Sequence, residues 1–135
     1  ERRTIGIEPD YACSLGMPSV GRRGNFLVEI DRGTMPVERS DLKQTSILRK
    51  FLAYGAVWRA KQHTQAFGWR SFRVLIVTAN AERATHMRQT LQKLVGGNGS
   101  PLFWFADVDT LYAGNVLEHN WIDGEGQTRR LLPSP

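Results

Sequence analysis

One stretch decides the fold of this chain: Phe26-Leu27-Val28-Glu29-Ile30-Asp31-Arg32-Gly33-Thr34. Its apolar start predicts a β-strand, and Glu29 and Asp31 leave the same face of that strand about 7 Å apart. A second strand-like segment, residues 5–14, carries Asp10 directly after Pro9. Because paired strands lie about 4.8 Å apart, Asp10 can join the other two carboxylates. The three carboxylates together outline a pocket for a divalent metal ion.

The two segments predict a β-hairpin. Residues 5–14 and 25–31 are the strands, and the glycines and proline of residues 16–24 predict an exposed loop that carries Arg22 and Arg23. In this hairpin we expect Asp10 beside Glu29 or Asp31, with the carboxylates on one face of the sheet.

A long helix is predicted after the second strand. Thr34 or Ser40 can cap its start, and it should run to about His63. One core stripe is expected at Leu48, Phe51, Leu52 and Trp58. A second stripe contains Ile47, Lys50, Tyr54 and Val57. Lys43 lies one heptad before Lys50, so both amino groups can point the same way.

The second half of the chain alternates between strand and helix. Residues 72–78 predict a central buried strand, residues 81–94 a helix that ends at a glycine-rich segment, and residues 102–106 another strand. A short helical segment near residues 108–112 and a hairpin from residues 120–123 and 127–132 complete the order. This order predicts an α/β fold with a mixed sheet flanked by helices.

Composition limits the class of protein. The 135 residues are 41% apolar and 23% charged, which fits a single globular domain over residues 1–135. No apolar run is long enough for a membrane helix and the start lacks a signal sequence, so we expect a cytoplasmic protein. A net charge of +5 favours an acidic partner, DNA first. The start without Met suggests a fragment of a longer protein.

Other chemistries have little support in the sequence. The three histidines lack the spacing of a zinc site and have no cysteine partners. The glycines at 96, 97 and 99 follow a helix and not a strand, so they do not form a phosphate-binding loop. Neither Ser14 nor Ser19 lies in a Gly-x-Ser-x-Gly turn. The acidic cluster is therefore the strongest candidate site.

The chain resembles the PD-(D/E)xK (restriction-endonuclease-like) superfamily, and within it most closely the replication-relaxation family of plasmids and mobile elements. The resemblance covers nearly the whole chain, and its most specific element is Glu29-Ile30-Asp31-Arg32-Gly33-Thr34. Its other segments are Pro9-Asp10, Lys50-Phe51-Leu52-Ala53-Tyr54, Arg73-Val74-Leu75-Ile76-Val77-Thr78, and the ending with Trp121 and Leu131-Leu132-Pro133. It implies a C-terminal nuclease-like core that follows an N-terminal winged-helix domain.

The resemblance also implies an activity and its site. Asp10, Glu29 and Asp31 would hold Mg²⁺ or Mn²⁺ for DNA cleavage in plasmid or mobile-element replication or mobilisation, in contact with other proteins of that process. The superfamily places a lysine where this chain has Asp31, so Lys50, or alternatively Lys43, would take that role. Apart from the resemblance, the positive charge of Arg22, Arg23 and Lys43 makes them candidates for contact with DNA phosphates. The open alternative is a catalytically inactive module that binds DNA or protein.

Overall fold

The computed structural model describes residues 7–17, 22–32, 47–97 and 99–131. The strands are β1 (Tyr11–Met17), β2 (Arg22–Ile30), β3 (Arg73–Thr78), β4 (Phe103–Asp107), β5 (Trp121–Asp123) and β6 (Thr128–Arg129). The helices are α1 (Ile47–Arg59), α2 (Gln62–Phe67), α3 (Ala81–Val95) and α4 (Val108–Tyr112).

All of these strands form one mixed sheet, in the order β1-β2-β3-β4-β5-β6. The central strands β2, β3 and β4 are parallel, whereas β1 at one side and β5 and β6 at the other are antiparallel to their neighbours. The predicted α/β fold with a mixed sheet is thus confirmed. The carboxyl ends of the three parallel strands meet at one edge, which is where ligands bind in open α/β sheets.

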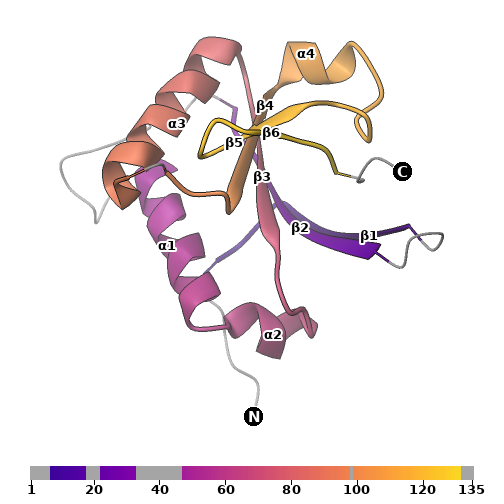
Figure 1. Ribbon diagram of the computed structural model, residues 1–135, viewed down its shortest axis with the longest axis vertical. Coiled ribbons are helices and arrows are strands. Elements are labelled where there is room, and N and C mark those ends of the chain that lie inside the picture. The colour runs from indigo at the N-terminus through magenta and orange to yellow at the C-terminus, as the bar shows by residue number, and fades with distance from the viewer. Residues whose placement is uncertain (1–6, 18–21, 33–46, 98, 132–135) are drawn as a thin grey trace.

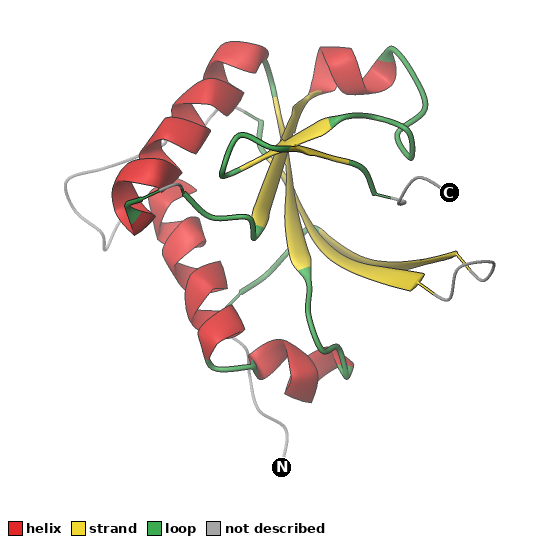
Figure 2. Cartoon of the chain, in the orientation of Figure 1, coloured by secondary structure: helices red, strands yellow, loops and turns green. Residues whose placement is uncertain are grey.

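Helices cover the two faces of the sheet unequally. Figure 1 shows α1 and α3 together on one face and the short α4 on the other, and Figure 2 shows the same layers by element type. Strand β3 serves both layers, because Val74 and Ile76 pack in the core under α1 and α3 while Leu75 and Val77 pack in the core on the α4 side. Burial on both faces explains its unbroken apolar sequence.

The hairpin extends further than the sequence predicted. Strand β1 begins only at Tyr11, so the prediction of a strand was wrong for residues 7–10, and it continues to Met17. Strand β2 begins at Arg22, so Arg22 and Arg23 lie in a strand and not in a loop. Gly24 is a strand residue as well. A Cβ atom there would lie 2.8 Å from the ring of Phe26, so this glycine leaves room for that ring. Glycine here marks close packing and not a chain turn.

The predicted long helix is divided in two. Helix α1 ends at Arg59, Lys61 adopts a left-handed backbone conformation with φ of 54°, and α2 follows. The break places His63 in the core, where its ring stacks on Trp58 and meets Phe72 edge-on. Packing of these rings therefore overrides the continuous helical pattern. The predicted helix starts, at Thr34 and Ser40, lie outside the described residues.

The predicted elements after residue 70 are confirmed within one or two residues, except that the last strand, predicted over residues 127–132, is only Thr128–Arg129. Helix α3 begins after Asn80, whose side-chain oxygen accepts a hydrogen bond from the Arg83 backbone N–H at 2.9 Å. Asp107 caps α4 in the same way. Strands β5 and β6 pair as a hairpin, and the buried Asp123 carboxylate accepts two backbone N–H groups and Arg129 around its turn. No described helix is long and apolar enough to cross a membrane.

Candidate active site at the end of β2

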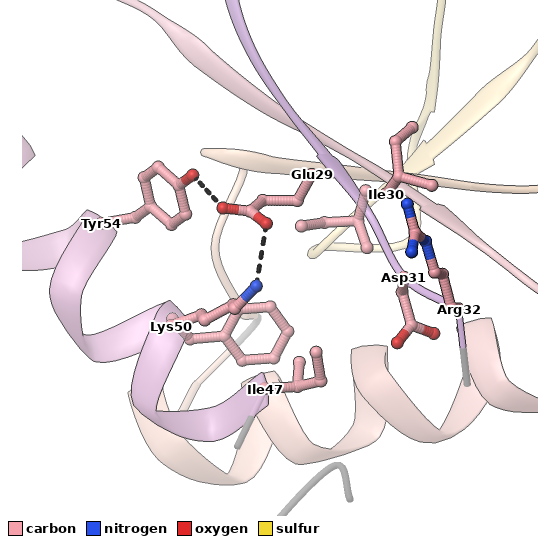
Figure 3. A pocket seen from close by; sticks show the side chains of 9 residues that line it. Glu29, Ile30, Asp31, Arg32, Ile47, Lys50 and Tyr54 are labelled. Atoms are coloured by element: carbon pink, nitrogen blue, oxygen red, sulfur yellow. Dashed lines mark hydrogen bonds and ion pairs between the residues drawn. The ribbon is translucent and has the colours of Figure 1, made fainter. Parts of the chain in front are cut away.

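Glu29 lies near the end of β2 with its side chain buried. Two side chains from α1 reach it: Lys50 donates to Oε2 at 3.0 Å and Tyr54 donates to Oε1 at 2.5 Å. Figure 3 shows the phenol and the ammonium group meeting the two carboxylate oxygens from the same helix. The predicted approach of Lys50 to the acidic strand is therefore present in the structure.

The helix presents Lys50 and Tyr54 together because they are four residues apart. The Lys50–Tyr54 stripe faces the sheet, since Ile47, Tyr54 and Val57 are all buried. On the other stripe Leu48, Leu52 and Trp58 are only half-buried, and Phe51 alone is in the core. The Lys50 side chain is 35% exposed, so its ammonium group is only partly shielded from solvent where it contacts Glu29.

The Tyr54 hydroxyl stays protonated and therefore acts as a hydrogen-bond donor. Burial raises the pKa of its phenol, and the hydrogen bond to Glu29 and the charges of Glu29 and Asp10 raise this pKa further. A protonated phenol donates to Glu29 at any pH near neutrality. Tyr54 was not among the predicted site residues, although its position four after Lys50 in the second stripe was the available signal.

Asp31 follows β2 and has different partners. Its carboxylate accepts hydrogen bonds from Nε and Nη2 of Arg83, the second at 2.9 Å, and from the Thr78 hydroxyl at 2.7 Å. Its backbone N–H donates to the Val77 carbonyl at 2.7 Å. The Asp31 side chain is only 4% exposed, so this ion pair links the end of β2 to β3 and to the first turn of α3.

Asp10 lies beside the end of β2, just before the regular pairing of β1 begins. Its Oδ2 accepts the Ile30 backbone N–H at 2.7 Å, and its own N–H donates to the Val28 carbonyl at 2.9 Å. The residue is exposed. Its charge nevertheless contributes to the raised pKa of Tyr54, so it acts on the same group as Glu29 does.

A cavity of about 120 Å³ opens between the end of β2 and α1. Its charged lining residues are Glu29, Asp31, Arg32 and Lys50, and Figure 3 shows Glu29 and Asp31 turned in different directions within it. Asp10 does not line this cavity. Among the described residues, no three His, Cys, Asp or Glu side chains are grouped so that they could hold a metal ion. The three-carboxylate metal site stays a prediction.

Two of the residues predicted to bind DNA lie at the start of β2. Arg23 is an exposed residue near the start of β2, and Arg22 is the first residue of that strand. Lys43 lies outside the described residues, so the choice between Lys43 and Lys50 rests on the observed contact of Lys50 alone. Arg83 and Thr78 were missed by the sequence analysis. Their partner Asp31 comes from a distant segment, and no local pattern marks such a contact.

Comparison of the chain with protein-family models, curated proteins and solved structures found no match.

Proposed function

We propose that the chain is a nuclease-like domain that acts on DNA as a Mg²⁺-dependent endonuclease, with Asp10, Glu29 and Lys50 at its site. The observation that carries the proposal is the contact between Lys50 and Glu29. The resemblance to PD-(D/E)xK proteins required a lysine from the helix to replace the one missing two residues after Glu29. A lysine of α1 is placed 3.0 Å from that carboxylate.

The donor set suits magnesium that keeps most of its waters. Mg²⁺ is usually bound through one or two carboxylates and the substrate phosphate and not through a full protein cage. Asp10 and Glu29 are two such carboxylates beside the end of one strand, and Asp10 Oδ1 accepts no hydrogen bond from the described residues. When bound, the metal would lower the pKa of the attacking water and neutralise charge on the phosphate.

The protein's own groups have separate tasks in this proposal. Tyr54 fixes the Glu29 carboxylate by its hydrogen bond, so that one orientation is maintained. Lys50 stabilises the negative charge that develops on the phosphate oxygens, because its ammonium group is exposed enough to reach substrate. Asp31 accepts hydrogen bonds from Arg83 and Thr78, and these bonds fix the position of the chain at the end of β2. In the cellular setting that the resemblance implies, the substrate is plasmid or mobile-element DNA.

The experiment is a nicking assay on supercoiled plasmid with the wild-type protein. We expect conversion to open-circular DNA in Mg²⁺ or Mn²⁺ and none in a chelator. Cleavage that persists in the chelator, or no cleavage with a folded protein that binds the metal in calorimetry, would contradict the proposal.

A second candidate is a catalytically inactive module that binds DNA. The ion pairs favour it, because Lys50 and Arg83 already neutralise Glu29 and Asp31 without metal. Such a module would bind duplex DNA without divalent metal and without preference for base sequence. The net charge of +5 favours this binding, because basic side chains attract DNA phosphates.

Salt dependence tests whether the start of β2 belongs to that surface. Removing two phosphate contacts with Arg22→Ala/Arg23→Ala should lower the slope of log affinity against log salt by about 1.8, since each contact contributes about 0.9. Titrations by fluorescence anisotropy at several salt concentrations measure this slope. Lys93→Ala, an exposed charge in the last turn of α3, is the matched control. An unchanged slope in the double variant would remove Arg22 and Arg23 from the interface.

A further inference from the structure

A second and larger cavity lies away from the candidate active site. It is a groove of about 460 Å³ between α1, the C-terminal half of α3 and the segment that leads into β4. Most of its lining is apolar, and Leu94 and Val95 at the end of α3 remain 37% and 49% exposed. Its volume falls in the range of sites that bind small molecules.

Two arginines are the charged residues of this groove. No aspartate or glutamate lines it, so Arg59 and Arg73 leave it with positive charge. Neither arginine forms an ion pair with the residues that the structure describes. An apolar groove with two guanidinium groups is complementary to an apolar molecule that carries one anionic group.

The position of Arg59 depends on a glycine inside α1. A Cβ atom on Gly55 would lie 3.2 Å from Nη1 of Arg59, so the guanidinium group lies back over Gly55 along the helix. Glycine in a helix interior costs about 1 kcal/mol relative to alanine. Here it leaves room for the guanidinium group to lie along the helix, and Arg59 remains an exposed residue that lines the groove.

Arg73 is fixed by other contacts. Its guanidinium carbon lies 5.6 Å from the centre of the Trp58 ring, and its Nη1 donates to the Phe72 carbonyl at 3.1 Å. The residue is half-buried. Arg73 is therefore held in place before any ligand arrives, which lowers the entropy cost of binding.

We infer that this groove binds a small amphipathic carboxylate, with its hydrocarbon part on the apolar lining and its carboxylate on Arg59 and Arg73. The inference is independent of the nuclease proposal, because the groove shares only Phe51 with the lining of the cavity at Glu29.

Decanoate is a suitable probe, with decanol as the neutral control. Calorimetry of the whole chain should show saturable binding of decanoate below its micellar concentration and at least about tenfold weaker binding of decanol, since hydrogen bonds to charged groups contribute strongly. Arg59→Gln and Arg73→Gln should each weaken decanoate binding by about tenfold or more.

The matched control is Arg88→Gln, an arginine of α3 that does not line the groove and should leave decanoate affinity unchanged. Thermal unfolding shows whether each variant is folded. Equal affinity for decanol, unchanged affinity in both groove variants, or no binding at millimolar decanoate overturns the inference. It is also overturned if the variants instead lose self-association in sedimentation or lose duplex DNA binding, because the groove would then serve a second copy of the chain or a nucleic acid.

Discussion

Nicking of supercoiled plasmid in Mg²⁺ should be lost in Glu29→Gln and reduced by about 10²-fold or more in Lys50→Ala. Glutamine keeps an acceptor for the Tyr54 hydroxyl but removes the charge that a metal ligand needs. Lys50→Ala removes a cation that stabilises charge in the transition state, which typically costs 10²-fold or more. Gel quantification of open-circular DNA over time measures both effects. Asp10→Asn should behave like Glu29→Gln.

DNA affinity in a chelator separates loss of chemistry from loss of binding. Replacing Glu29 or Asp10 by its amide removes negative charge, so attraction to DNA phosphates cannot weaken when no metal is present. Tyr54→Phe is a further control for positioning. It keeps Glu29 charged and the ring packed, so it should slow nicking less than Lys50→Ala does. Full nicking by Glu29→Gln would exclude Glu29 from the site, and the contact with Lys50 would then be only structural.

Most of the fold could be predicted because each element depends on local sequence. The continuous apolar run within residues 72–78, the cap at Asn80 and the apolar spacing of α3 are all local patterns, and they agree with the structure. The errors occur where tertiary packing decides. Gly24 was predicted in the loop because glycine is frequent in turns. In the structure it instead makes room for the ring of Phe26, a contact that the local sequence does not reveal. The helix break at Lys61 follows from the packing of His63 on Trp58 and Phe72.

The candidate site was predictable to a smaller extent. Lys50 was expected near Glu29 through the resemblance, which needed a lysine of the helix to replace the one missing at Asp31, and the two groups are 3.0 Å apart in the structure. The partners of Asp31 could not be found in this way. Arg83 is 52 residues distant, and it meets Asp31 only because β2 and β3 are parallel neighbours and α3 starts where β3 ends. The three carboxylates, Asp10, Glu29 and Asp31, therefore differ in role because different residues surround each of them in the folded chain.

The ion pair between Asp31 and Arg83 predicts the largest effect on stability. Arg83→Met removes the guanidinium group that pairs with the buried Asp31 carboxylate, and breaking a buried pair in this way typically costs about 3–5 kcal/mol. For a domain of this size we expect a fall in Tm on the order of 10 °C or more. The double variant Asp31→Leu/Arg83→Met should recover most of this loss, because it removes both charges together. Thermal unfolding by circular dichroism measures all three proteins.

A further variant, Asp31→Asn, decides what Asp31 does at the site. Asp31→Asn keeps the size of the side chain and an acceptor for Thr78, so the protein should remain folded at temperatures well below the lowered Tm. If Asp31 only supports the end of β2, this variant nicks plasmid at a rate within a few-fold of wild type at such temperatures, while Glu29→Gln is inactive. Loss of nicking in folded Asp31→Asn, with Mg²⁺ affinity reduced in calorimetry, would instead place Asp31 among the metal ligands. That result would require the Arg83 ion pair to open when metal binds, and Arg83→Met should then bind Mg²⁺ more tightly than wild type.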